Sequence, residues 1–439
     1  MKFASVSRIF PSWENVLLAI LAAALLILSF PDFEYWFLAW FALAPLMWAV
    51  EREKASTTRS FVLGWIFGTI FFFSTCWWLT FAPITYAGFP PVLAYFLLFM
   101  VTAITGVFPG IFAGILSIFL RRFGSMAFLA APFVWVFTEF LRYWVTGNNW
   151  NAIGYSQAFG LSSILEMSGF GGMYLSGFGV VIVTAFLTFL IVGKNNRSQR
   201  YVIGSLSLVI LSGHWLLDPD STQSSSLSEF GTKIIAIQAN VPMAGLDSQK
   251  WNQLRQRQID LAEAEIRQLT TDNRQPTTVI LPESPMNFMY NDDREFQQFI
   301  GDFARRNNVS VLFNSAEPDA TNGKYFNSAV MVGPDGREAA QYDKIYLLPF
   351  GEAVPSFLEG IVPGFVGNFS YGGEYDILPL GDAKAGVMIC FESHFGQLSR
   401  QYVRNGADVL IEMTNDGYLG PTPILRQHLA NAVFRAVET

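Results

Sequence analysis

Residues 61–120 of this chain contain no Asp, Glu, Lys, Arg or His. A helix on the surface of a soluble protein needs a polar face, and a stretch without charges supplies little of one. About 20 consecutive apolar residues are enough for a helix to cross the hydrocarbon core of a bilayer. After about residue 218 the sequence changes to the charged, alternating pattern of a globular domain. The chain is therefore predicted to have a membrane half followed by a soluble half.

Seven candidate spans lie in the first half, each near the length that a bilayer requires. They cover residues 13–30, 33–50, 61–81, 91–120, 127–144, 169–192 and 201–217. The first resembles the apolar core of a signal peptide, but no small-residue cleavage site follows it, so we expect a retained anchor. We assign residues 1–217 to an α-helical polytopic membrane domain, 218–231 to a Ser-rich linker and 232–439 to the soluble domain.

The short loops between these spans carry an asymmetric charge. If the N-terminus is cytoplasmic, ten basic residues of the membrane half lie on that side: Lys2, Arg8, Arg52, Lys54, Arg59, Arg121, Arg122, Lys194, Arg197 and Arg200. The opposite side carries only Arg142. Lys and Arg favour cytoplasmic loops, and an odd number of spans then places the soluble half on the outer face of the membrane.

The soluble half alternates between the patterns of strands and helices. Apolar, β-branched strands are predicted at 233–238, 278–281, 309–313, 385–389 and 408–412, with a hairpin over 330–342 and helices at 249–269, 294–307, from 394 and at 424–437. This order predicts an α/β sandwich whose sheets are covered by helices. The net charge of −7 argues against a nucleic-acid partner.

Three candidates for catalysis follow predicted strands, where reactive groups gather in α/β sheets: Glu283, Cys390 and the turn Thr414-Asn415-Asp416. Lys344 follows the return strand of the predicted hairpin. Taken alone, Glu283, Lys344 and Cys390 each have an ordinary structural interpretation: a surface acid, a solvated lysine and a small buried thiol. Cys390 also precedes a predicted helix, whose N-terminal dipole would favour a thiolate. Two cysteines and three scattered histidines predict neither a disulfide framework nor a metal site.

The motifs around these residues resemble a known family. LPESP (281–285), YDKIYLLPFGEAVP (342–355) and VMICFES (387–393) are similar to the Glu–Lys–Cys signature of the nitrilase (carbon-nitrogen hydrolase) superfamily. Together with the membrane half and its NAIGYSQ segment (151–157), they resemble the apolipoprotein N-acyltransferase family over the whole chain. The resemblance implies an αββα nitrilase-like sandwich after the membrane domain.

The resemblance also implies a role for each matching residue. Glu283 corresponds to the general base, Lys344 to the cation that stabilises the oxyanion, and Cys390 to the nucleophile. Supporting positions are Glu352, Glu392, Trp251 and Phe391, the last in place of a Tyr found in many members. The chemistry is consistent with this, because a thiol needs a base to become a good nucleophile and an oxyanion needs a preorganised positive group.

The implied activity is acyl transfer in lipoprotein maturation at the bacterial inner membrane, with the catalytic domain in the periplasm. A membrane phospholipid would give an acyl chain to the cysteine as a thioester, and the acceptor would be the N-terminal amine of diacylglyceryl-cysteine in an apolipoprotein. No cofactor or metal is implied. The family continues through further strands and an eighth span, so we expect the natural chain to extend beyond Thr439 and a chain ending there to be unstable and weakly active.

The apolar loop over residues 345–375 is long enough to suggest a function, and we expect it to line a lipid cavity or dip into the outer leaflet, the alternative being a buried core insertion. The main alternative activity is a membrane-tethered amidase of the nitrilase type. A transporter with a soluble accessory domain is another interpretation, kept open by Glu139 and Arg142 in the fifth span. A Cys–His protease using His394 is weaker, because no orienting partner is evident.

Overall fold

A computed structural model describes residues 9–192, 231–241, 247–269, 276–283, 288–349, 351–354 and 369–439. Its contacts divide the chain into two units. The helical unit comprises Met1–Thr222 and Leu419–Glu438, and the sandwich unit comprises Gln223–Tyr418 and Thr439. The predicted span at 201–217 and residues 218–230 of the linker lie outside the described residues, as do residues 350 and 355–368 of the apolar loop.

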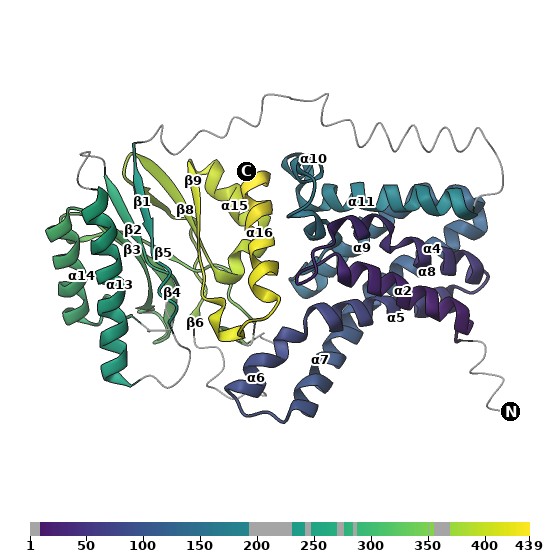
Figure 1. Cartoon of the computed structure of the whole chain (residues 1–439), viewed down its shortest axis with the longest axis horizontal. Helices are drawn as coiled ribbons and strands as arrows, with labels where there is room; N and C mark the ends of the chain where they lie inside the picture. Colours follow the sequence, from purple (N-terminus) through teal and green to yellow (C-terminus); the bar gives the residue numbers. More distant parts are fainter. Residues whose placement is uncertain are drawn as a thin grey trace. The chain divides into compact units, whose positions relative to one another are not determined.

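The helical unit is built from apolar helices, of which α2, α4, α8 and α11 are labelled in Figure 1. Its longer helices are α2 (Trp13–Leu28), α4 (Ala44–Glu53), α5 (Thr57–Thr75), α7 (Pro91–Thr105), α8 (Val107–Phe123), α9 (Ala131–Thr146) and α11 (Ser168–Val192). Short elements join them: η1 (Trp36–Leu38), α3 (Ala39–Ala42), η2 (Trp77–Thr80), α6 (Phe81–Thr85), η3 (Gly124–Ala130), η4 (Ile153–Gln157) and α10 (Ser162–Glu166). A single apolar core runs through the unit and includes Leu26, Phe67 and Phe112.

Several of these helices are suited to a membrane. Within the described residues, the helical stretch Pro91–Thr146 and helix Ser168–Val192 are long and apolar enough to cross one, and Thr57–Thr75 with Trp77–Thr85 forms a third candidate bent by 59°. The segment predicted as one span at 33–50 is instead divided into η1, α3 and α4. The helical architecture agrees with the predicted membrane domain, while the number of seven spans stays a prediction.

Glycines allow α5 and α8 to pack closely. A Cβ atom on Gly64 would lie 2.2 Å from the carbonyl oxygen of Pro109, and one on Gly68 would lie 2.7 Å from the Pro109 ring. No side chain fits at these distances, so the glycines are needed where the two helices touch. Close packing of α5 against α8 therefore explains why glycine occupies both positions.

The last helix, α16 (Ile424–Glu438), is grouped with the helical unit, which differs from the predicted boundaries. Its Phe434 is fully buried in the core of that unit. The Gln427 side chain accepts hydrogen bonds from the indoles of Trp78 (3.1 Å) and Trp150 (2.8 Å). The amphipathic pattern of α16 predicts that one face of the helix is buried, but not which surface packs against that face. From the sequence, α16 was therefore assigned to the soluble domain that precedes it.

The sandwich unit contains two sheets. The first has the order β1-β2-β3-β4-β5, with β6 paired to β4, and the second has the order β7-β8-β9. The strands are β1 (Lys233–Ala236), β2 (Thr277–Ile280), β3 (Ser310–Pro318), β4 (Tyr325–Val332), β5 (Glu338–Asp343), β6 (Phe369–Ser370), β7 (Ile377–Leu380), β8 (Ala383–Ile389) and β9 (Val409–Met413). β1, β2 and β3 are parallel, β3 to β5 are antiparallel, and β8 and β9 are parallel.

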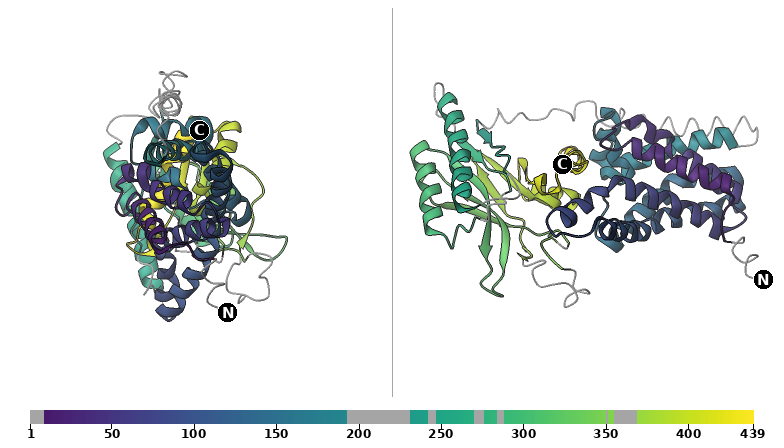
Figure 2. Two further views of the ribbon diagram at one scale, coloured as in Figure 1. Left: turned by 90° about the vertical axis from the view of Figure 1, so that its right-hand side faces the viewer. Right: turned by 60° about the horizontal axis from the view of Figure 1, so that its bottom comes forward.

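Helices cover both sheets of this unit. α13 (Ser248–Leu269) and α14 (Arg294–Asn307) lie on the outer side of the first sheet, and α15 (Gly396–Arg404) lies beyond the second (Figure 1). The right-hand view of Figure 2 shows the two green helices on the same side of the first sheet. The predicted α/β sandwich is confirmed. The sequence did not predict β6 and β7, which are only two and four residues long.

Candidate active site

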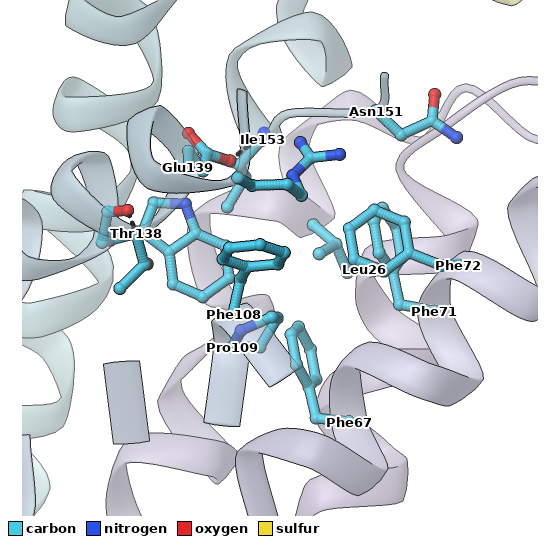
Figure 3. Close-up of a pocket in the computed structure, with 12 residues that line it drawn as sticks. Leu26, Phe67, Phe71, Phe72, Phe108, Pro109, Thr138, Glu139, Asn151 and Ile153 are labelled. Atoms are coloured by element: carbon cyan, nitrogen blue, oxygen red, sulfur yellow. Dashed lines mark hydrogen bonds between the residues drawn. The ribbon is translucent and has the colours of Figure 1, made fainter. Parts of the chain in front are cut away.

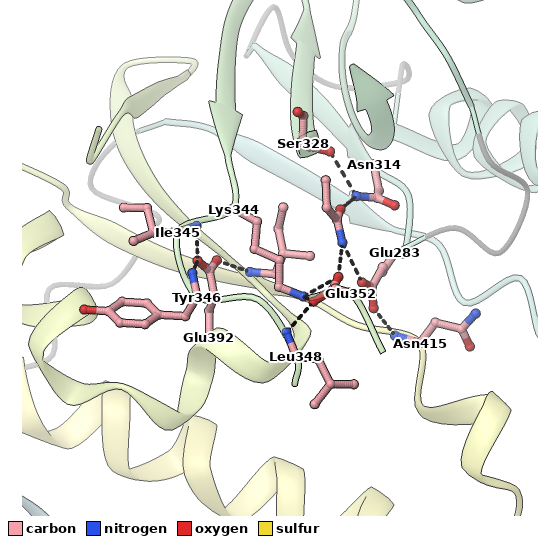
Figure 4. A network of polar contacts seen from close by, with 12 residues as sticks. Glu283, Asn314, Ser328, Lys344, Ile345, Tyr346, Leu348, Glu352, Glu392 and Asn415 are labelled. Carbon is pink, nitrogen blue, oxygen red and sulfur yellow. Dashed lines mark hydrogen bonds and ion pairs between the residues drawn. The ribbon is translucent and has the colours of Figure 1, made fainter. Parts of the chain in front are cut away.

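Glu283, Lys344 and Cys390 each follow a strand of the sandwich unit, as predicted. Glu283 comes three residues after β2, Lys344 directly after β5, and Cys390 directly after β8. Figure 4 shows Glu283 and Lys344 in one polar network with Glu352 and Glu392. The fold therefore brings an acid, a cation and a thiol from three distant parts of the sequence to one place.

Lys344 and Glu352 form a buried ion pair. The Lys344 Nζ atom lies 2.8 Å from each carboxylate oxygen of Glu352, and Lys344 is 1% exposed. The amide of Leu348 donates a third hydrogen bond to this carboxylate, at 2.7 Å. Burial alone would lower the pKa of Lys344, but the charges of Glu352 and then Glu283 outweigh it and raise the pKa above its ordinary value. The ammonium group therefore stays charged at neutral pH.

Glu283 is held by two donors. Its Oε1 accepts from the side chain of Asn327 at 3.4 Å, and its Oε2 accepts from the backbone amide of Asn415 at 3.2 Å. Burial raises the pKa of Glu283 above its ordinary value, and the nearby positive charge of Lys344 opposes that effect. A carboxyl group with a raised pKa is suited to accept a proton near neutral pH.

Cys390 is the first residue of the short helix η8 (Cys390–His394) and has a left-handed backbone conformation with φ of +53°. This conformation costs a residue other than Gly about 1–3 kcal/mol and recurs at functional sites. Burial, and then the charge of Glu283, raise the pKa of the thiol well above its ordinary value, while Lys344 lowers it. The expected thiolate is not favoured, because burial raises the pKa of the thiol and the helix that begins at Cys390 is only five residues long.

The thiol and the base are in direct contact. A hydrogen bond between the side chains of Cys390 and Glu283 contributes to the pKa of Glu283, and it acts to lower that pKa. Since the thiol is protonated at rest, it becomes a nucleophile only as its proton moves to a base. Glu283 is placed to take that proton.

Glu392 is fully buried behind the nucleophile. Its Oε1 accepts hydrogen bonds from the Tyr342 hydroxyl (2.7 Å) and from the amides of Ile345 (2.8 Å) and Tyr346 (3.0 Å). Its Oε2 accepts from the amide of Ile389 at 2.9 Å. Burial raises the pKa of Glu392, and Lys344 opposes that effect. This carboxylate ties the end of β8 to the segment that follows Lys344.

The two aromatic candidates lie in different surroundings. Phe391 is buried beside the nucleophile, with its ring stacked on His394 at 5.4 Å and edge-on to Phe395 at 5.2 Å. Trp251 lies on α13 and packs against the apolar core under the first sheet.

Two members of the network were not predicted from the sequence. The Asn327 side chain donates to Glu352 at 2.6 Å as well as to Glu283, and it accepts a hydrogen bond from Asn314 at 2.6 Å. Tyr342 supplies the hydroxyl that contacts Glu392. The available signal was weak: Asn327 and Ser328 are polar residues within the mostly apolar strand β4.

Glu139 and Arg142, the charged pair of the helical unit, line a small cavity, in which Glu139 is labelled in Figure 3. Glu139 accepts from the amide of Ile153 at 2.7 Å, and Arg142 donates to the carbonyl oxygen of Trp150 at 2.7 Å and lies 4.9 Å from the centre of the Phe72 ring. The cavity has a volume of about 20 Å³, which is room for about one water molecule. Among the described residues, Glu139 and Arg142 hold the segment after α9 through these hydrogen bonds. The cavity is too small for a transported solute.

Comparisons with known proteins cover both halves of the chain. The profile of the apolipoprotein N-acyltransferase N-terminal domain matches residues 22–186, and that of carbon-nitrogen hydrolase matches residues 262–439. Among solved structures, a carbon-nitrogen hydrolase from Helicobacter pylori is similar at 18% identity, over 47% of this chain and 67% of that chain, with a TM-score of 0.33.

Curated relatives match nearly the whole chain. The apolipoprotein N-acyltransferase of Geobacter metallireducens is 30% identical, over 97% of this chain and 82% of its own length. That of Photobacterium profundum is 27% identical, over 98% of this chain and 82% of its own length. Together with the apolar helices and the nitrilase-like sandwich, these matches show that the chain belongs to the apolipoprotein N-acyltransferase family.

Proposed function

We propose that this protein transfers an acyl chain from a membrane phospholipid to the N-terminal amine of diacylglyceryl-cysteine in apolipoproteins, through a thioester on Cys390. Family membership supports lipoprotein N-acylation in general. The transfer through a thioester is supported by three groups that follow β8, β2 and β5. They are the protonated thiol of Cys390, the carboxyl group of Glu283 with its raised pKa, and the buried ammonium group of Lys344.

The first half-reaction forms the thioester. Glu283 takes the thiol proton as the Cys390 sulfur attacks the carbonyl carbon of the sn-1 ester, and Lys344 stabilises the negative oxygen of the tetrahedral intermediate. The bond between that carbon and the glycerol oxygen then breaks, and Glu283 returns the proton to the departing oxygen. The products are an acyl-enzyme and a lysophospholipid.

The second half-reaction forms the amide. The neutral amine of the lipoprotein attacks the thioester carbon, and Glu283 takes a proton from the nitrogen. Lys344 again stabilises the oxyanion, the carbon–sulfur bond breaks, and the sulfur recovers its proton from Glu283. Donor and acceptor use the same site in turn, so the kinetics are of the ping-pong type.

The proposed location is a multi-pass protein of the bacterial inner membrane with its catalytic domain in the periplasm. The ten-to-one distribution of basic residues supports this orientation, and the apolar helices of the helical unit support membrane insertion. A reporter enzyme that functions only in the periplasm, fused after residue 228, is expected to be active. Activity of a strictly cytoplasmic reporter at the same position would reverse the orientation.

Intact-mass measurement tests the thioester. The full chain is incubated with phosphatidylethanolamine in mixed micelles and should gain the mass of one acyl group, which hydroxylamine removes. Cys390→Ala should abolish the adduct, whereas Cys76→Ala should retain it, because Cys76 is the other free cysteine and lies in the helical unit. An adduct that persists in Cys390→Ala would refute the nucleophile. Hydrolysis of small amides without lipid transfer would favour the amidase instead.

A further inference from the structure

Segment 369–372, near the C-terminal end of the apolar loop, is held by more than its strand pairing. β6 (Phe369–Ser370) pairs in parallel with the start of β4, with Phe369 opposite Tyr325 and Ser370 opposite Phe326. Strands in globular proteins usually have at least three residues, so two residues supply few ladder hydrogen bonds. Another interaction is needed to hold this end of the loop in place.

A buried pair of side chains supplies that interaction. The Ser370 hydroxyl donates to Oδ2 of Asp319 at 2.6 Å, and both residues are 6% exposed. Asp319 directly follows β3, and its Oδ1 accepts from the amide of Thr321 at 2.9 Å. The Asn322 side chain donates to the Ser370 hydroxyl at 3.0 Å. The turn that follows β3 thus orients the carboxylate of Asp319, so that its Oδ2 atom faces the Ser370 hydroxyl.

The same segment holds the backbone of both partners of the buried ion pair. The amide of Phe369 donates to the carbonyl oxygen of Glu352 at 3.2 Å. The amide of Gly372 donates to the carbonyl oxygen of Lys344 at 2.8 Å. Ser370 lies between these two donors in the sequence, so its contact with Asp319 fixes the segment on which both depend.

We infer that Asp319 and Ser370 are positioning residues, which fasten segment 369–372 so that Glu352 stays paired with Lys344. The inference rests on the proposed role of Lys344 in the acyl transfer. Both residues act through the backbone of the ion pair and not on the reacting atoms. If this segment is loosened, Glu352 moves away from the ammonium group of Lys344. Burial, which lowers the pKa of Lys344, is then less well opposed by the charge of Glu352.

The test compares Ser370→Ala, which removes the hydroxyl, with Ser370→Thr, which keeps it. The rate of acyl-adduct formation on the full chain in phosphatidylethanolamine micelles is measured across pH, together with the KM for the phospholipid and the Tm. Ser370→Ala should lower the rate roughly ten- to a hundredfold, the scale of a small misplacement of a catalytic group. It should also move the alkaline limb of the pH–rate profile to lower pH, with the phospholipid KM unchanged, and Ser370→Thr should restore both.

Two further variants separate positioning from folding. Asp319→Asn keeps an oxygen that can accept from Ser370 but removes the negative charge. The alkaline limb of its pH–rate profile should move in the same direction as in Ser370→Ala, by a smaller amount. Asp302→Ala removes an exposed carboxylate on α14 and should behave as wild type. A wild-type rate and pH profile in Ser370→Ala overturns the inference, and so does a lower rate with an unmoved alkaline limb. If the wild-type chain forms no adduct at all, the proposed function itself fails, and the inference fails with it.

Discussion

The Nζ atom of Lys344 lies 2.8 Å from both carboxylate oxygens of Glu352. An ammonium group has three N–H donors, and in the part of the chain that the structure describes two of them are used by Glu352. The third remains for an oxygen that becomes negative during the reaction. Because Glu352 fixes the ammonium group from one side, little reorganisation is needed when that charge develops.

Glu352→Gln should weaken this arrangement in a pH-dependent way. Lys344 must be protonated to stabilise an oxyanion, and its pKa is raised mainly by the charge of Glu352. Without that charge burial lowers the pKa, so the alkaline limb of thioester formation should move to lower pH. The rate at neutral pH should fall on the order of 10²-fold, the scale of a lost oxyanion contact. The pH–rate profile of adduct formation measures both effects.

Glu374→Gln is the matched control for this variant. Glu374 is an exposed carboxylate of the same unit, so its replacement should leave the alkaline limb where it is. A shift of equal size in both variants would mean that net charge, and not the pairing with Lys344, sets the profile.

Glu283→Gln should make the protein inactive but more stable at neutral pH. The pKa of Glu283 is raised in the folded state, so ionising it costs folding free energy. Below the ordinary glutamate pKa the carboxyl is protonated in both states, and wild type and variant should have similar stability. As pH rises through the raised pKa, the wild type loses stability that the amide variant keeps. A tenfold difference between the ionisation constants of the folded and unfolded states corresponds to about 1.4 kcal/mol.

Thermal unfolding of both proteins in micelles between about pH 4 and 8 measures this difference, because the window begins near the ordinary glutamate pKa. The gap between the two Tm values should open as pH increases. A gap that is constant across the range would show that the raised pKa of Glu283 does not affect stability.

The sequence placed Glu283 and Cys390 correctly in the fold because each follows a strand of apolar pattern, and it placed Lys344 through the hairpin whose return strand precedes it. Their supporting network was only partly predictable. Asn327 contacts Glu283 and Glu352 because β4 and β5 pair in one register, with Ser328 opposite Asp343. A register arises from long-range pairing, so no local pattern around Asn327 indicates its role.

The position of α16 shows a second limit. Its amphipathic pattern correctly predicts a helix with one buried face, and its bounds agree closely with those expected. The partner of that face is set by contacts such as those of Gln427 with Trp78 and Trp150, which are far away in sequence. The periodicity of apolar residues shows which face of a helix is buried, but not which surface packs against that face.

Tyr342→Phe should destabilise the protein and slow thioester formation. The change removes one of the donors to the buried carboxylate of Glu392, at 2.7 Å, and leaves the other backbone donors. A hydrogen bond to a charged group contributes roughly 1.5–3 kcal/mol, so the Tm should fall measurably. Tyr371→Phe is the control, because Tyr371 is 61% exposed. Equal Tm values for the two variants would exclude a role for the Tyr342 hydroxyl.

Neighbouring glycines allow a sharp test of the segment behind Lys344. A Cβ atom on Gly372 would lie 2.0 Å from the carbonyl oxygen of Asp343, whereas one on Gly373 would meet nothing within 4 Å. Gly372→Ala must therefore push the segment away from the backbone of Asp343 and Lys344, and its hydrogen bond to the Lys344 carbonyl should be lost. Gly373→Ala adds the same methyl group one residue later, in open space.

We expect Gly372→Ala to reduce the rate of acyl-adduct formation roughly tenfold or more, because a catalytic group displaced by about 1 Å can lose about a hundredfold in rate. Its alkaline limb should move to lower pH, as in Glu352→Gln, since both changes loosen the pairing of Lys344 with Glu352. Gly373→Ala should match wild type in rate, pH profile and Tm. If Gly372→Ala also matched wild type, the close approach to Asp343 would be absent from the working enzyme, and the backbone of Lys344 would not depend on this segment.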